Sequence, residues 1–132
     1  MNLSFSLMFP WGKPTNFVQK ILCISGYTPK VHTFRHGTRW MSGKIIHFCT
    51  GMRTKNYKCF KSSKCKSVQR AKITITHIPS HTIWVLIDDR LLSDFEVSIL
   101  AKNDGFESVQ DFAQWFKDGF SGQLVHWTDL KY

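Results

Sequence analysis

The sequence predicts an α+β fold in the form of a small, mostly antiparallel β-barrel flanked by helices. Several segments alternate polar and apolar residues with the period of two that half-buried strands show. The expected order of elements, β-α-β-β-β-β-α-α-β, also leaves too few helices between strands for a parallel sheet. Because the chain has 132 residues, no repeats and no internal linker, we expect a single domain spanning residues 1–132.

The first two thirds of the chain are expected to consist mainly of strands. Thr15 is the expected N-cap of the one helix in this part, over residues 16–25. The many lysines of residues 50–63 favour a loop there. Strands are expected at residues 2–9, 30–35, 44–49, 68–76 and 82–87, with a break at Pro79 and Ser80 between the last two.

The last third changes character and begins with a predicted helix. Ser93, with Glu96 three residues later, forms a capping box that opens a helix over residues 93–102. The residues of this helix that we expect to face the core are Phe95, Ile99 and Leu100. A tight turn follows, in which Gly105 is the natural left-handed residue. Ser108 then caps a helix over 109–117, and a closing strand is expected at 124–130.

Ionised side chains are distributed unevenly along the chain. Residues 1–87 contain 14 Lys and Arg and no acid, whereas residues 88–132 contain 4 Lys and Arg and all nine Asp and Glu. Solubility alone favours interspersed signs. A long segment of one sign indicates a surface that meets a polyanion, and a basic protein without a specific partner is the alternative.

The sequence contains no indication of export or membrane insertion. No apolar run reaches the roughly 18 residues of a membrane-spanning helix, and residues 1–9 lack the basic region and cleavage site of a signal peptide. We therefore expect a soluble, cytoplasmic protein with no membrane partner. Its four cysteines are expected to fill core or loop positions, a zinc site using Cys59 and Cys65 being the alternative. We expect no metal and no cofactor.

Three polar residues near the start of a predicted strand could carry chemistry. Alternate residues of a strand share a face, so Thr33 and Arg35 can point the same way, and Lys30 can reach them from the strand's start. Lys30 would supply a positive charge or, when desolvated, a base. Arg35 would grip a phosphate or a base edge with its forked guanidinium. A solvated basic strand is the alternative.

A second candidate is the basic stretch over residues 51–72, in which Tyr57 and Phe60 interleave with lysines and arginines. Cations beside exposed rings can neutralise the phosphates and stack on the bases of a single-stranded nucleic acid, although a solvated loop is the alternative. His32 could hydrogen-bond a ligand, whereas the other strand histidines are expected in the core or on a sheet face. The nucleic-acid-binding candidates are Lys30, His32, Arg35, Arg39, Arg53, Lys55, Tyr57, Lys58 and Lys61.

The chain also carries a series of short motifs. They are Lys30-Val31-His32-Thr33-Phe34-Arg35, Arg39-Trp40-x-x-Gly43-Lys44-Ile45, Asn103-Asp104-Gly105-Phe106, Trp115-Phe116 and Leu124-Val125-His126-Trp127. In order and spacing they resemble the ASCH domain, a branch of the PUA-like barrels, over roughly residues 16–132. The chain is also similar to small ASCH-type proteins encoded by phages and their bacterial hosts.

The resemblance implies a cleft between barrel and helices that binds RNA or a nucleotide and is lined by the K-x-x-T-x-R segment. One ASCH branch deacetylates N4-acetylcytidine with a lysine, a threonine and a glutamate. Lys30 and Thr33 match the first two, and Asp104 stands at or near the position of the glutamate. Thr33 would then be the nucleophile, Lys30 its base and Asp104 an orienting group or proton shuttle. Alternatively, Asp104 fixes the turn or caps the next helix.

We therefore predict an RNA- or nucleotide-binding module whose partner is RNA, another single-stranded nucleic acid or a modified nucleoside. An amidohydrolase acting on N4-acetylcytidine-like nucleosides is the alternative. A ribonuclease, as other members of the resembled family are reported to be, and a phage-encoded protein-interaction module are further alternatives. The interaction module would present the same basic face to an acidic protein partner.

Overall fold

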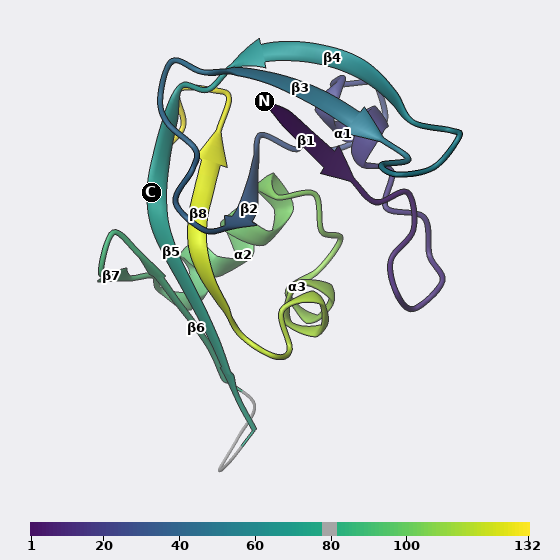
Figure 1. Ribbon diagram of the computed structural model, residues 1–132. Coiled ribbons are helices and arrows are strands. Elements are labelled where there is room, and N and C mark those ends of the chain that lie inside the picture. Colours follow the sequence, from purple (N-terminus) through teal and green to yellow (C-terminus); the bar gives the residue numbers. More distant parts are fainter. Residues whose placement is uncertain (78–81) are drawn as a thin grey trace.

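The computed structural model describes residues 1–77 and 82–132 and shows an α+β fold (Figure 1). The strands are β1 (Asn2–Phe5), β2 (His32–His36), β3 (Ile45–Thr50), β4 (Lys58–Lys64), β5 (Ser67–Thr76), β6 (Thr82–Ile87), β7 (Arg90–Leu91) and β8 (Phe120–His126). The helices are α1 (Phe17–Ile21), α2 (Asp94–Asn103) and α3 (Val109–Trp115). The predicted break at Pro79 and Ser80 lies outside the described residues.

The strands form two sheets. One has three strands in the order β1-β3-β4, and the other has five in the order β2-β8-β5-β6-β7. Among the described strands, every pairing is antiparallel except that of β1 with β3. The predicted α+β class with mostly antiparallel strands is therefore confirmed. Within the same residues no strand pairing closes the two sheets into a barrel.

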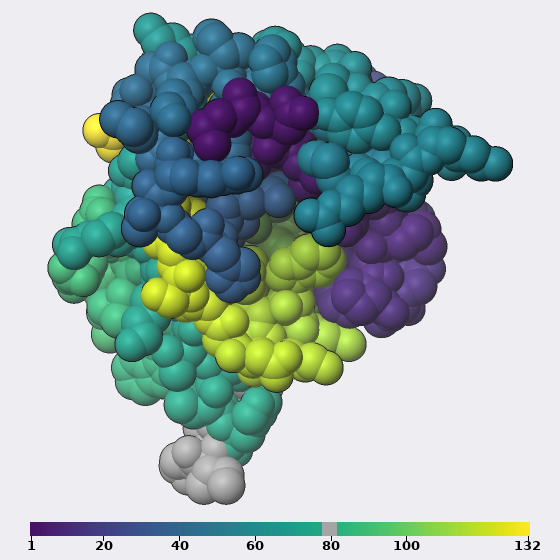
Figure 2. Space-filling view, in the orientation of Figure 1, coloured from purple at the N-terminus to yellow at the C-terminus, as the bar shows by residue number. Residues whose placement is uncertain are grey.

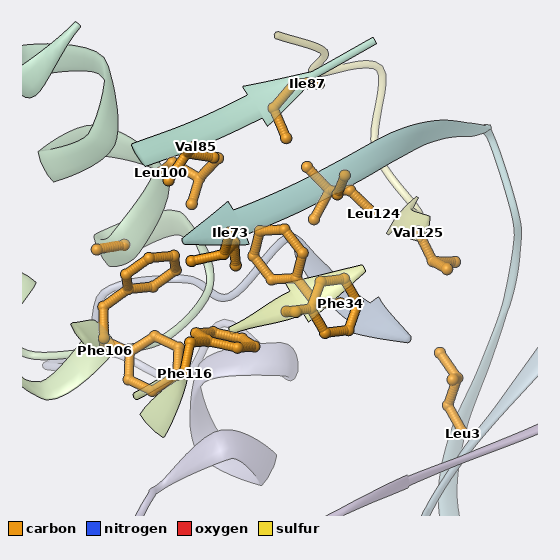
Figure 3. Packing of buried hydrophobic residues seen from close by; sticks show 14 of the residues in the cluster. Leu3, Phe34, Ile73, Val85, Ile87, Leu100, Phe106, Phe116, Leu124 and Val125 are labelled. Atoms are coloured by element: carbon orange, nitrogen blue, oxygen red, sulfur yellow. The ribbon is translucent and has the colours of Figure 1, made fainter. Parts of the chain in front are cut away.

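A core rich in aromatic rings lies between the five-stranded sheet and the helices. Phe34 of β2 packs edge-on against Phe116 with ring centroids 5.2 Å apart, and Phe116 in turn meets Phe106 at 6.1 Å. Figure 3 shows these rings converging with Ile73 of β5 and Leu124 of β8 on one interior. Because β8 pairs with both β2 and β5, it lies inside the five-stranded sheet and holds β2, the strand that follows Lys30, at the edge of that sheet.

The N-terminal elements are shorter than the sequence predicts. β1 ends at Phe5 rather than at residue 9, and α1 spans five residues rather than ten. Thr15 is not the N-cap, although its hydroxyl accepts the amide of Phe17 at 3.3 Å while it donates to the Ser6 carbonyl at 2.6 Å. Asn16 takes the cap position with a φ of 56°, a left-handed conformation that asparagine tolerates.

Two further segment predictions are wrong. Residues 50–63 are not one loop, because β4 begins at Lys58. The lysines of β4 lie on the edge strand of a sheet, where charged side chains discourage pairing with other chains. The closing strand is Phe120–His126 rather than 124–130, because its register is set by pairing with strands on both sides.

The signals for the two later helices are confirmed. Ser93 and Glu96 form the predicted capping box of α2, and the Ser108 side chain accepts the amide of Asp111 at the start of α3. The core face of α2 is only partly as expected. Leu100 is fully buried, but Phe95 is 73% exposed and Ile99 is also exposed.

Cys49 and Cys59 form a disulfide between β3 and β4. The expectation that all four cysteines are free fillers is therefore wrong for this pair, whereas Cys65 is free and buried and Cys23 is free and exposed. Disulfides are uncommon in reducing compartments, so the predicted cytoplasmic location stays a prediction. None of the described helices is long and apolar enough to cross a membrane.

Replacing both members of the disulfide, in Cys49→Ser with Cys59→Ser, should lower the free energy of unfolding by about 2–3 kcal/mol, because the bridge restricts the unfolded chain. Urea denaturation measures the loss, with the exposed Cys23→Ser as control. The expectation is contradicted if adding a dithiol reductant leaves the urea midpoint of the wild type unchanged.

Candidate functional site

A cavity of about 120 Å³ opens beside β1 and β2 and under the loop that follows α2. Lys30, Thr33, Arg35 and Asp104 all line it. The structure thus brings the K-x-x-T-x-R segment together with the carboxylate that lies 74 residues after Lys30. The aromatic residues of its wall are Phe5, Phe17, Phe34, Phe106, Trp115 and Phe116.

Asp104 is the C-cap of α2 and is almost fully buried. Its Oδ1 lies 3.2 Å from Lys30 Nζ and 3.0 Å from His32 Nδ1. Lys30 Nζ also donates to the main-chain carbonyl of Asp104. Oδ2 makes no hydrogen bond within the described residues, and Asp104 lines the cavity, so Oδ2 can accept an N–H from a bound molecule.

Two buried lysines meet the C-terminal end of α2. Beside Lys30, Lys20 of α1 donates to the Gly105 carbonyl at 2.7 Å and to Glu107 Oε1 at 2.8 Å. The last carbonyls of a helix lack partners in the helix and carry partial negative charge, so ammonium groups are favourable there. The local role of Lys30 is therefore that of a helix cap as well as a cavity wall.

The turn between Asp104 and the α3 segment requires glycine at position 105. Gly105 has a φ of +94°, which confirms the predicted left-handed conformation. A Cβ at this position would lie 2.9 Å from the Phe17 ring and 3.1 Å from Lys30 Cδ. The absence of a side chain thus lets Lys30 and Phe17 pack directly on the turn.

His32, a predicted ligand-binding residue, does not line the cavity. Its side chain is fully buried, and both ring nitrogens are occupied, Nδ1 by Asp104 and Nε2 by the Tyr132 hydroxyl at 2.7 Å. Asn103 also donates to that hydroxyl, at 3.0 Å. His32 therefore orients the Asp104 carboxylate, and Tyr132 and Asn103 support it. Nothing in the sequence pattern singles out Tyr132, whose contact with His32 spans 100 positions.

Burial perturbs the charged groups of the cavity. It lowers the pKa of Lys30 from 10.5 to about 8, although the nearby Asp104 carboxylate acts in the opposite direction. Burial likewise lowers the pKa of His32, again against the effect of Asp104, and lowers the pKa of Arg35 to about 10. A part of the Lys30 population is consequently a neutral amine near neutral pH.

The Arg35 guanidinium is held by one hydrogen bond and lines the cavity. Its Nη2 donates to the Ser4 carbonyl at 2.8 Å, and its guanidinium carbon lies 5.0 Å from the centre of the Phe5 ring. Nε is buried and has no hydrogen-bond partner among the described residues. The Thr33 hydroxyl also makes no hydrogen bond within the described part of the chain, and both residues line the cavity.

The other predicted binding residues do not line this cavity. Arg39 is exposed and lies over Trp40, 5.6 Å from its ring. Lys61 is half-buried beside Phe48, and the Tyr57 hydroxyl accepts a hydrogen bond from Asn2 at 2.6 Å. Arg53, Lys55 and Lys58 are exposed around the β3–β4 connection. Among the described residues, no cluster of metal-ligating side chains is present.

The pKa of Lys30 is lower in the folded protein than in the unfolded chain. Between about pH 8 and 10.5 the folded state therefore binds fewer protons at Lys30 than the unfolded state does. As pH rises through that window, the contribution of Lys30 to the free energy of unfolding increases. The stability difference between wild type and Lys30→Met should therefore grow by about 1 kcal/mol from pH 8.5 to 9.5. Denaturant titrations at both pH values measure it, with the exposed Lys102→Met as control. Equal differences at the two pH values contradict this assignment.

No protein-family model, no curated protein and no solved structure matches this chain. The resemblance to the ASCH domain accordingly stays an interpretation of the motifs themselves.

Proposed function

We propose that this chain is an RNA- or nucleotide-binding module of the ASCH type, with a PUA-like arrangement of sheets, that takes one base or nucleoside into the cavity. The observation that carries the proposal is the convergence of Lys30, Thr33, Arg35 and Asp104 on one aromatic-walled cavity. A solvated basic strand would leave these side chains in water, whereas Lys30, Thr33 and Asp104 are buried.

The lining of the cavity suits a planar ring with polar edges. Nucleobases taken out of their stack are held by aromatic and apolar faces and by hydrogen bonds to the base edge. Phe17 and Trp115 supply rings on the wall. Asp104 Oδ2 can accept from an amino group, and Arg35 can donate to a carbonyl or a phosphate.

Electrostatics favours an anionic or electron-rich ligand. Asp104 is already shared by Lys30 and His32, and the Arg35 guanidinium has no carboxylate partner within the described residues. Arg53 and Lys55, two exposed cations of the β3–β4 connection, belong with Arg35 to the acid-free segment of residues 1–87 and add to its positive charge. A ligand with a phosphate would therefore be attracted more strongly at low salt.

Arg35→Met should weaken binding of a single-stranded RNA by about 10- to 100-fold, because it removes charge-assisted hydrogen bonds and retains the apolar stem. Fluorescence anisotropy with a labelled 12-nucleotide RNA at several salt concentrations measures the affinity. The exposed Lys102→Met removes the same charge elsewhere and should change it little. Absence of binding, or an affinity that does not fall with salt, contradicts the proposal.

A second function, amidohydrolase activity on an N4-acetylcytidine-like nucleoside, is favoured by the lowered pKa of Lys30, which lines the same cavity as Thr33. The neutral amine of Lys30 would take the proton of the Thr33 hydroxyl while the hydroxyl oxygen attacks the carbonyl carbon of the acetyl group. The C–N bond then breaks, the leaving amine receives that proton, and water hydrolyses the acetyl ester on Thr33. Asp104 would hold the Lys30 amine in place.

If this reaction occurs, N4-acetylcytidine should be converted to cytidine and acetate, and the rate should rise with pH through about 8 as Lys30 loses its proton. Thr33→Val should abolish the conversion, since it removes the hydroxyl and keeps the shape of the side chain. Chromatography of the products measures both. Failure of the wild type to release cytidine rules out the reaction, and an equally active Thr33→Val rules out Thr33 as nucleophile.

A further inference from the structure

We propose that the cavity is the middle of a continuous surface track for a single-stranded polynucleotide, running from Lys72 on β5 past Arg35 to the β3–β4 connection. The proposal rests on the proposed nucleic-acid-binding function and deepens it, because it selects a polymer rather than a free nucleoside. It also adds Lys117 and Asp118, which no sequence motif indicates, and Lys72, which ends the basic stretch over residues 51–72.

On one side of the cavity the track continues over β2 and the end of α3. A neighbouring hollow of about 340 Å³ shares Arg35 and Trp115 with the cavity. That hollow also contains His36 and Asp118, and both residues line a further open hollow of about 560 Å³. The larger hollow reaches Lys72 of β5, so the three depressions are joined by shared side chains.

On the other side the track continues along β1. A hollow of about 420 Å³ shares Ser4, Phe5 and Ser6 with the cavity and extends to Met52. The exposed Arg53 follows directly. Figure 2 shows the first residues of the chain (purple), the segment after β2 (blue) and the α3–β8 region (yellow-green) meeting around a recess on one face.

The charges along the track suit a phosphate backbone with one unfavourable exception. Lys72 and Lys117 are exposed and line the large hollow, and Arg35 lies where the hollows join. Asp118 lines the same hollow and, within the described residues, has no ion-pair partner. Removing its charge should therefore strengthen the binding of a polyanion.

The form of the central cavity selects a single strand. It is the more enclosed part of the track and has aromatic walls, so it fits a base that is not stacked on its neighbours. The shallower hollows on either side can then hold the adjoining sugars and phosphates. A duplex, whose bases are stacked inside the helix, would leave the cavity empty.

The first test compares ligand lengths. Anisotropy and competition should show that a 12-nucleotide single-stranded RNA, or its DNA counterpart, binds at least about 100-fold more tightly than a nucleoside 5′-monophosphate, because several phosphates are engaged at once. Equal affinities overturn the track and leave the proposed function standing. Absence of binding by both ligands overturns both, and equal binding of a 12-base-pair duplex overturns the choice of a single strand.

The second test changes the flanks of the track. Lys72→Ala and Lys117→Ala should each weaken the 12-nucleotide ligand by about 3- to 10-fold and reduce the salt slope by about 0.7, with monophosphate binding unchanged. Asp118→Asn should strengthen the 12-nucleotide ligand by a similar factor. Asp129→Asn, an exposed change of the same chemistry that lines none of these hollows, is the control. An Asp118→Asn protein that binds like the control overturns the proposed path.

Discussion

The candidate site depends on one buried contact, in which the Asp104 carboxylate is held between Lys30 and His32 at the end of α2. Removing a carboxylate and an ammonium from water is costly, and the mutual attraction offsets the cost only when further hydrogen bonds complete the geometry. The carbonyl of Asp104 and the Tyr132 hydroxyl provide those bonds. The contact also joins the cationic first segment of the chain to the acidic last segment, as does the pair of Lys20 with Glu107 on the neighbouring turn.

The same groups serve the fold and the cavity. Lys30 caps a helix, and its burial there is what lowers its pKa into a range where a neutral amine is present. Well-packed apolar residues often stabilise a protein as much as a buried ion pair does, so such a pair is weak support for stability alone. The pair also lines the aromatic cavity, which is the position that the proposed function uses. Within the described residues, Arg35 Nε and the Thr33 hydroxyl likewise have no hydrogen-bond partner, whereas buried polar groups normally have one.

Local signals predicted local structure well. The Ser93 capping box, the Ser108 cap and the left-handed Gly105 each depend on residues within three or four positions, and all three are confirmed. Predictions that depend on distant partners were wrong. The N-cap of α1 is Asn16 rather than Thr15, whose hydroxyl also bonds the distant Ser6 carbonyl, and the register of β8 is set by β2 and β5. The lysines that favoured a loop in residues 50–63 instead lie partly on an edge strand, because an edge leaves charged side chains in water.

The sequence by itself determined the α+β class, the uneven distribution of charge and the residues Lys30, Thr33, Arg35 and Asp104 as candidates. The class, the charge distribution and the candidates Lys30, Thr33 and Arg35 follow from composition, alternation and short spacings, which are properties of neighbouring residues. Asp104 became a candidate only through the resemblance to the ASCH domain. Only the tertiary structure decided that the four candidates meet, that His32 orients Asp104 and that Cys49 pairs with Cys59. Each of these facts requires the chain to fold back on itself, and the relative placement of two segments is set by the packing of the core between them, which no local pattern encodes.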